Sequence, residues 1–456
     1  MGKQEPDTVP GNSTELSGGG KYDPASKRAQ IAVIARNKPK EVFSNLMHHL
    51  TYDLVRGHLE KISNKSAAGV DGMTKEEAIK NLDWILPPIL DAIHQGHYDA
   101  PPVRRVYIPK ANGGERPIGV PAIIDRAIQA ATATILNQIY EQDFLASSFG
   151  FRPGLSCHHA LATINELIFQ KYMPYVLEVD IRDFFGSLSH EWLRKFLKVR
   201  IGDERVLKLV DSWLRAGVME NGRVEIEEVG TPQGGSISPI LSNIYLHYVL
   251  DLWFEKKIKK QLTHRSGLVR YADDFSILFC REVDMKTVKT LLIARLSQFG
   301  LTIADDKSHM TNLTPRANRG KDRRRMTFLG FSIYREKIRN GNGYRVAFLT
   351  ESKRFSRAKR SMKQKLSAIK HFDLKQQAET INAILVGHYN YYGFVGNSHA
   401  LSHFRDQTIR YWRRCLFRRS QQEMTWIKFR GILEKYPLKP ARVRVRYADI
   451  GALVRL

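Results

Sequence analysis

The sequence predicts an α+β protein, in which long helical stretches are combined with a few antiparallel strands. Helical apolar periodicity runs through most of residues 29–100 and returns from about residue 351 onward. Between these regions, short apolar runs bounded by turn residues predict strands, most clearly the hairpin over residues 268–279. No run of about 18 apolar residues is present, so we expect a soluble chain without a membrane partner.

Residues 1–28 are predicted to be a disordered leader, because Gly, Ser, Pro and Asp dominate and the apolar segment of a secretory signal is lacking. The alternating run 103–108 predicts a strand that enters a turn at Asn112-Gly113-Gly114. Helices are then expected over residues 122–145, after Ser238-Pro239 and over roughly 285–299, and strands over 175–181 and 222–229.

Three carboxylates are candidates for a metal site. Asp273 and Asp274 lie side by side inside the predicted hairpin, and Asp180 lies near the end of an apolar strand. Asp is common in turns, so the pair alone indicates either a turn or a metal site. If the strands are neighbours, three carboxylates meet at one rim and repel each other unless a cation lies between them. Oxygen ligands without His or Cys suit Mg²⁺, and two such ions can activate a 3′-hydroxyl and stabilise a leaving pyrophosphate.

The net charge of +26 is confined to the C-terminal third. Residues 316–370 hold 18 Lys and Arg against 3 Asp and Glu, and residues 401–446 hold 13 against 3. A short charge run is usually a solvated face, but an imbalance over about a hundred residues indicates a polyanion-binding surface. The three cysteines include no CxxC pair, so we expect no zinc site or disulfide and a reducing cytoplasm, with association with the nucleoid as an option.

A series of motifs resembles the reverse transcriptases encoded by bacterial group II introns. In chain order these motifs are RPIGVPAIIDRAIQ, SFGFRPGLSCHHAL, VDIRDFFGSL, GTPQGGSISPILSNIYL, YADD, LTIADDKS and FLGF. The later GHYNYYG and KYPLKPARV resemble the maturase (X) region of that family. The resemblance covers roughly residues 45–446, and seven motifs in register make it specific.

The resemblance implies a right-hand polymerase followed by a helical thumb and maturase domain. Residues 29–100 would form a helical N-terminal extension and the start of the fingers. Residues 101–347 would form the fingers and a palm with an antiparallel sheet, and residues 348–456 the basic thumb and maturase domain. No Cys and His ligand set follows ARVRV. We therefore expect no HNH endonuclease and at most a small DNA-binding appendage.

The family implies roles for the carboxylates and for one lysine. Asp180, Asp273 and Asp274 match its metal-binding triad, with Asp274 as the weakest ligand, and Ile181 is carried over as a metal-binding and dNTP-binding position. Two Mg²⁺ ions are the implied cofactors. Lys307 matches the proton donor to the leaving pyrophosphate, although a lysine here could instead neutralise the neighbouring Asp305 and Asp306.

Further positions are implied to contact the nucleotide and the primer. Lys110 and Arg116 would grip the triphosphate, Phe185 would exclude the 2′-hydroxyl, and Gln233 would contact the incoming nucleotide. Each has a simpler reading, as a solvated charge, a core phenylalanine or a loop residue. Phe184 is expected in the core, and Arg152 either anchors a loop or faces the nucleotide. The primer grip is implied to be Phe328, Leu329 and Gly330.

The C-terminal helices carry candidate nucleic-acid contacts. Arg410, Arg414 and Arg418 recur every four residues on one helix face, while Ile409, Trp412 and Leu416 form an apolar stripe on another. Arg354, Arg357 and Lys363 are further candidates. The aromatics of GHYNYYGFVG either stack on unpaired bases or form the packed core of the thumb.

The sequence therefore predicts an RNA-directed DNA polymerase that also binds group II intron RNA to assist splicing and mobility. The expected partners are that RNA, an RNA template with a DNA primer, dNTPs and target DNA. The oligomeric state, monomer or homodimer, is left open. One alternative is a non-catalytic RNA-binding splicing cofactor, and another is a reverse transcriptase that serves in defence, repair or CRISPR adaptation.

Overall fold

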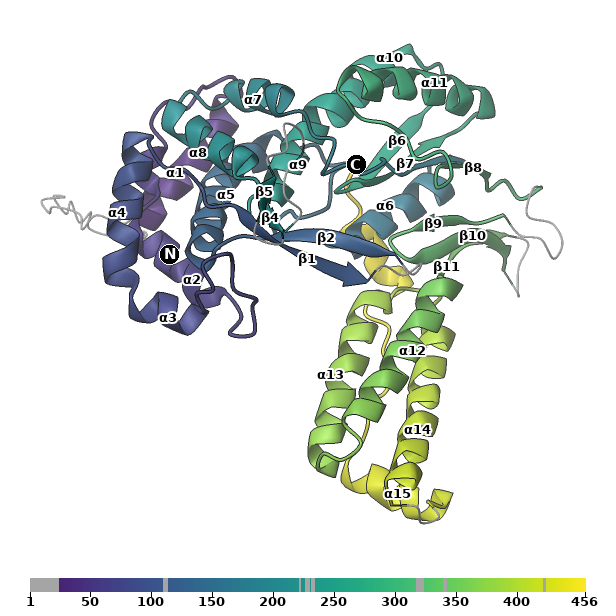
Figure 1. Ribbon diagram of the computed structural model, residues 1–456. Coiled ribbons are helices and arrows are strands. Elements are labelled where there is room, and N and C mark those ends of the chain that lie inside the picture. The colour runs from purple at the N-terminus through teal and green to yellow at the C-terminus, as the bar shows by residue number, and fades with distance from the viewer. Residues whose placement is uncertain are drawn as a thin grey trace, which may run out of the picture.

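The computed structural model describes residues 24–109, 114–220, 223–225, 230, 234–316, 324–338, 343–420 and 424–456. It confirms the predicted α+β class and divides into helices at the N-terminal end, three small sheets, and a helical C-terminal unit (Figure 1). The first helix, α1 (Pro24–Asn37), begins inside the predicted leader. Residues 24–28 are therefore helical, which corrects that boundary, and residues 1–23 lie outside the described part of the chain.

The N-terminal helices pack around one long helix. α1, α2 (Tyr52–Lys61) and α3 (Lys75–Lys80) lie against α5 (Ile123–Asp143), whose buried face carries Ile124, Ala127, Ile128, Ala131 and Ile135. α4 (Leu82–Gln95) packs on α2 and α3. The first sheet follows this bundle in the order β2-β1-β4-β5. Its strands are β1 (Val103–Pro109), β2 (Glu115–Val120), β4 (Val218–Glu220) and β5 (Arg223–Glu225).

The central sheet is antiparallel throughout, in the order β6-β7-β3-β8. Its strands are β3 (Tyr175–Val179), β6 (Ser266–Tyr271), β7 (Asp274–Phe279) and β8 (His309–Asn312). Because side chains alternate along a strand, the sheet buries both faces. Leu177 and Ile277 pack toward α9 (Ser238–Leu246) and α11 (Glu282–Gln298), whereas Val176 and Leu278 pack toward α6 (Cys157–Phe169).

Several shorter elements complete this half of the molecule. α7 (His190–Lys198) and α8 (Glu204–Arg215) join β3 to β4, and α10 (Lys259–Gln261) precedes β6. π-Helical turns extend α9 over His247–Asp251 and Phe254–Ile258, and single 3₁₀ turns occupy Met47–His49 and Tyr447–Asp449.

A third sheet connects to the helical C-terminal unit, which projects away from the sheets (Figure 1). The sheet contains β9 (Met326–Phe328), β10 (Phe331–Lys337) and β11 (Tyr344–Thr350). The unit contains α12 (Ser352–Ala368), α13 (Leu374–Tyr392), α14 (Ser398–Ser420) and α15 (Trp426–Lys435), packed around the fully buried Trp412. α16 (Ile450–Leu453) returns to pack on α6. Within the described ranges, every helix is too short or too polar to cross a membrane.

Candidate active site

The register of the central sheet brings the three predicted carboxylates to one rim. Val179 of β3 pairs with Phe275 of β7, and the next position along both strands places Asp180 beside Asp274. β6 and β7 are joined by a two-residue turn, Ala272 and Asp273, closed by the pair Tyr271 and Asp274. Ala272 has a φ of 58°, as the first central residue of type II′ hairpin turns requires. The turn thus places Asp273 directly at the rim.

The electrostatics of the rim are those of crowded carboxylates. Burial raises the pKa of Asp273, and the charge of Asp180 adds to the increase. Burial and the charge of Asp273 raise the pKa of Asp274 to about 7, although part of this residue still contacts solvent. Positive charge placed between these side chains would favour their ionised forms.

The donor set suits a hard divalent cation, because it consists of carboxylate oxygens. In the described ranges, no group of three or more His, Cys, Asp and Glu side chains lies close enough together to hold a metal ion, so Asp180, Asp273 and Asp274 share a rim without forming a ready three-carboxylate site. The Asp180 Oδ2 atom lies 3.7 Å from the Nζ atom of Lys307. Lys307 therefore faces the rim itself. The side chain of Ile181 is only 3% exposed and packs in the core, so only its backbone can contribute to the site.

A fully buried ion pair holds the turn, and the sequence analysis did not single it out. Arg270 of β6 donates from Nε and Nη2 to the carboxylate of Asp251, at 2.8 and 2.5 Å, and both side chains are fully buried. Its Nη1 donates to the carbonyl of Ala272 at 3.0 Å and to Oδ1 of Asn243 at 2.9 Å. The Asn243 amide in turn donates to the carbonyl of Gly150 at 2.8 Å.

Gly150 packs directly against the backbone of this turn. A Cβ atom at position 150 would lie 2.4 Å from the backbone nitrogen of Ala272, so only glycine fits against the turn. The signal available in the sequence was the arginine inside the apolar strand LVRYADD, because a buried charge needs a buried partner. The partner, Asp251, could not be identified from spacing.

The predicted primer-grip turn contacts the rim through its backbone. Leu329 has a φ of 49° between β9 and β10, and its backbone amide donates a hydrogen bond to the Asp274 carboxylate. Phe328 is 1% exposed and belongs to the core, so its side chain does not face the site. The Leu329 carbonyl accepts a hydrogen bond from the Tyr391 hydroxyl at 3.0 Å. The end of α13 is therefore tied to the turn that touches Asp274.

The aromatic cluster at the end of α13 is packed only in part. Tyr389 and Phe394 are 2% and 0% exposed, whereas Tyr391 is 40% exposed. The Phe331 ring lies 5.3 Å from Tyr392 and 6.3 Å from Tyr391. Tyr389 and Phe394 therefore fit the packed-core reading of GHYNYYGFVG, while Tyr391 keeps an exposed ring.

The predicted nucleotide contacts are described only in part. Lys110 and Gln233 lie outside the described residues. Arg116 lies exposed on β2, opposite Ile108, and its charge acts to lower the pKa of Asp273, so it faces the carboxylate rim. Phe185 is half-buried on the central core, whereas Phe184 is 2% exposed, as expected for a core residue.

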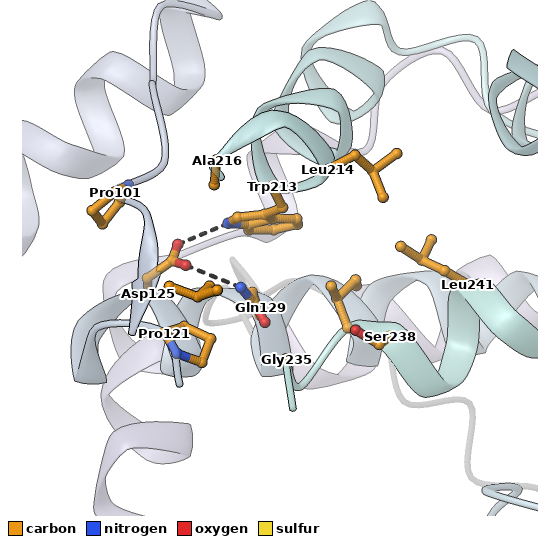
Figure 2. A pocket seen from close by; sticks show the side chains of 12 residues that line it. Pro101, Pro121, Asp125, Gln129, Trp213, Leu214, Ala216, Gly235, Ser238 and Leu241 are labelled. Carbon is orange, nitrogen blue, oxygen red and sulfur yellow. Dashed lines mark hydrogen bonds between the residues drawn. The ribbon is translucent and has the colours of Figure 1, made fainter. Parts of the chain in front are cut away.

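The glycines after position 233 lie against the first sheet and α5. Gly234 has a φ of +125°, and a Cβ there would meet the Gly119 carbonyl at 2.5 Å. Beside them is a small cavity of about 10 Å³, shown in Figure 2. In it Asp125 accepts hydrogen bonds from Trp213 Nε1 at 2.7 Å and from Gln129 Nε2 at 3.0 Å. Burial raises the pKa of Asp125 to about 6.

Arg152 anchors a loop and does not face the nucleotide. Its Nη1 donates to the carbonyls of Leu145 and Ser148, both at 2.8 Å, and its Nε pairs with Glu141 at 3.1 Å. Since Ser148 pairs with Arg270, this loop forms a single parallel β-bridge beside β6. Arg152 therefore supports the hairpin indirectly.

The predicted arginine stripe of α14 is exposed and is backed by the expected apolar face. Arg410, Arg414 and Arg418 are exposed, while Trp412 and Leu416 are 0% and 4% exposed. α12 packs beside α14, and the three predicted cations on α12, Arg354, Arg357 and Lys363, are exposed too. Two neighbouring helices thus offer cations to solvent.

Comparison with known proteins identifies the class of this site. Residues 108–333 match the family of reverse transcriptases (RNA-dependent DNA polymerases). This part of the chain, which contains all three carboxylates, is similar to that family.

Three relatives show which reverse transcriptases this chain resembles. The chain is 35% identical over 247 residues to Protein YkfC of Escherichia coli (strain K12), covering 48% of this chain and 65% of that protein. It is 34% identical over 221 residues to the group II intron-encoded protein LtrA of Lactococcus lactis subsp. cremoris, covering 48% and 37%. An uncharacterized 91 kDa protein in the cob intron of Schizosaccharomyces pombe is 32% identical over 255 residues, covering 55% and 30%. The predicted resemblance to group II intron-encoded reverse transcriptases is confirmed, and the chain spans less than two thirds of each relative.

Proposed function

We propose that this protein is an RNA-directed DNA polymerase that extends a DNA primer on an RNA template and also binds group II intron RNA to assist splicing. The observation that carries the proposal is the meeting of Asp180, Asp273 and Asp274 at one rim of a sheet that lies in a reverse transcriptase family region. A protein that only binds RNA has no physical need for carboxylates crowded enough to raise one another's pKa.

The residues at and near the rim would have separate roles in nucleotidyl transfer. Asp180, Asp273, Asp274 and the backbone of Ile181 would hold two Mg²⁺ ions, which supply Lewis acidity for the primer hydroxyl and the leaving pyrophosphate. Arg116, with Lys110 and Gln233, would bind the dNTP, and Phe185 would face its sugar. Lys307, which lies 3.7 Å from Asp180, would hold a proton for the pyrophosphate.

The helical C-terminal unit would hold the nucleic acid. The exposed cations of α12 and α14 suit contacts with phosphates, which fix position without reading sequence. The β9–β10 turn would place the primer end, because it contacts Asp274 on one side and Tyr391 on the other. RNA template, DNA primer, dNTPs, intron RNA and target DNA are the partners this arrangement supports.

Primer extension on an RNA template with Mg²⁺ tests the proposal. Asp273→Ala should lower dNTP incorporation by at least about a thousandfold, because the charge that holds the cation is lost. Its RNA affinity and unfolding midpoint should stay close to those of the parent protein. Asp305→Ala, a neighbouring carboxylate outside the rim, is the matched control and should extend primers normally. Extension by Asp273→Ala at the parent rate would refute the site.

A splicing assay tests the second half of the proposal. The protein is added to a self-splicing group II intron transcript at Mg²⁺ too low for unassisted splicing. The Asp273→Ala variant should stimulate splicing as the parent does, because RNA binding does not use the carboxylates. Loss of stimulation in that variant alone would show that the two roles are not separable.

A further inference from the structure

A basic pocket lies on the central sheet at the end of β6 that is farther from the carboxylates. Its volume is about 480 Å³, and its walls come from the segments 145–147, 265–268 and 455–456, together with Leu167, Lys171, Met173, Glu255 and Lys259. Ser266 lies five residues before Tyr271, so the pocket is roughly 17 Å along the strand from the turn. This distance separates it from the polymerase chemistry.

The wall formed by β6 is an incompletely paired sheet edge. β6 is the outermost strand of the central sheet, and on its outer side it pairs only at Arg270, which exchanges backbone hydrogen bonds of 2.8 Å with Ser147 and Phe149. Because backbone groups alternate in direction along a strand, those of Leu268 point outward like those of Arg270. In the part of the chain that the structure describes, no strand covers Ser266, Gly267 or Leu268 on that side.

The pocket also contains a buried polar group without a partner and an excess of positive charge. Ser266 is 3% exposed, and its hydroxyl makes no hydrogen bond within the described ranges. Glu255 neutralises Lys259 at 2.9 Å. Lys171, Arg265 and Arg455 form no salt bridge with any residue that the structure describes. A ligand here would therefore meet three cations, a hydroxyl and a strand edge.

We propose that this pocket docks a short, extended, acidic peptide segment of a partner protein, which adds to the outer edge of β6. A peptide offers both an N–H and a C=O to the edge, so it satisfies the outward amide and carbonyl of Leu268 together. Phosphates of a nucleic acid accept hydrogen bonds but donate none, and would leave that carbonyl unpaired. Acidic side chains match Lys171, Arg265 and Arg455. The edge pairing, more than the charge, favours a peptide.

Panning the intact protein against a phage-displayed library of linear hexapeptides tests this proposal. The expected result is enrichment of peptides with acidic residues at alternating positions. A synthetic, end-capped copy should bind at least about fivefold more weakly to Arg265→Glu and to Lys171→Glu, since each change replaces one attractive charge with a repulsive one. Lys260→Glu, an exposed lysine on α10 outside the pocket, is the charge-matched control and should bind as the parent does.

The mode of binding is tested with a backbone-modified peptide. Methylation of alternate peptide nitrogens removes the donors needed for strand addition but keeps every charge, so binding should fall to background. Equal binding of the methylated peptide would overturn the proposal, as would displacement of the peptide by a dT oligonucleotide in a manner that depends on Arg265. Enrichment that is no better than on the double variant Lys171→Glu/Arg265→Glu would also overturn it. Primer extension by the pocket variants should be unchanged, so failure here is distinguishable from failure of the polymerase assignment.

Discussion

The carboxylate rim and the arginine stripe of α14 use charge in opposite ways. At the rim, Arg270 and Asp251 are fully buried, and the donors of the arginine have fixed acceptors in Asp251, Asn243 and Ala272. On α14, Arg410 and Arg414 are exposed, and the helix is held by apolar contacts on its other face. A buried charge with fixed partners holds the neighbouring backbone in one geometry, whereas each exposed charge adds a small amount to the affinity for nucleic acid. We therefore expect abrupt losses at the rim and graded losses on the stripe.

The largest effect is expected from breaking the buried pair. Asp251→Ala leaves the Arg270 guanidinium buried without its carboxylate, which should lower the free energy of unfolding by about 3–5 kcal/mol. Urea unfolding followed by circular dichroism measures this loss. The double variant Asp251→Leu/Arg270→Met should recover much of the stability, because it removes both charges. It should still extend primers poorly, since the Ala272 carbonyl has lost its donor. Parent-like extension by the double variant would show that the pair does not position the turn.

The stripe should respond in proportion to the charges removed. Changing Arg410, Arg414 and Arg418 to Gln should reduce the dependence of log K for RNA on log salt by about 2, at roughly 0.7 per phosphate contact on a single strand. The free energy of unfolding should change by less than about 0.5 kcal/mol per site. Filter binding over a range of KCl concentrations measures the slope. The control is a variant in which the exposed Lys256, Lys257 and Lys260 are changed to Gln. A similar change of slope in the control would mean that the stripe contributes no more to RNA binding than other exposed cations.

One hydrogen bond joins α13 of the helical unit to the turn beside the rim, and its loss should have a smaller and more selective effect. Tyr391→Phe removes the donor to the Leu329 carbonyl and should cost about 1 kcal/mol of stability. Because the Leu329 turn also contacts Asp274, primer affinity should fall as well. Tyr389→Phe removes a 3.3 Å hydrogen bond to Lys439 inside the helical unit and should cost stability without affecting the primer. Equal primer kinetics in both variants would remove the proposed link.

The smallest effect is expected from the buried carboxylate beneath the glycine loop. The pKa of Asp125 is raised to about 6 in the folded protein, so the folded state holds its proton more tightly than the unfolded chain does. Asp125 therefore lowers stability progressively as the pH rises from about 4 to about 6. Asp125→Asn should gain stability relative to the parent over this window, and Gln129 can turn its unpaired Oε1 toward the new amide. Urea midpoints at pH 4.5 and 7.5 measure this; an unchanged difference between the two proteins would contradict the assignment.

The elements of the rim were predictable because they are local. The alternation of LVRYADDFSILF predicts the hairpin, and the apolar run before Asp180 predicts a separate strand. To bring the three carboxylates together, the sequence then needs only the assumption that this strand pairs with the hairpin. The two faces of α14 were predictable for the same reason, since helical spacing alone separates Arg410 from Trp412.

The partners of buried groups were not predictable, because they depend on tertiary contacts between distant segments. The pairing of Arg270 with Asp251, the contact of Lys307 with Asp180, and the attachment of Arg152 to a loop each required the assembled fold. The aromatic cluster of α13 is a similar case: its composition is compatible with base stacking and with a packed core. Only the fold shows that Tyr389 and Phe394 are buried while Tyr391 is 40% exposed. Lys110 and Gln233 remain predictions.

The pairing of β3 with β7 also has a consequence for the order in which the chain matures. Asp180 and Asp274 come from strands almost a hundred residues apart, and the Leu329 turn that contacts Asp274 comes later still. Contacts between such distant segments form after local helices and hairpins, because the intervening chain must first close its loop. A chain emerging from the ribosome therefore cannot complete the carboxylate rim until synthesis has passed β7. The proposed capacity for DNA synthesis would accordingly arise late in folding.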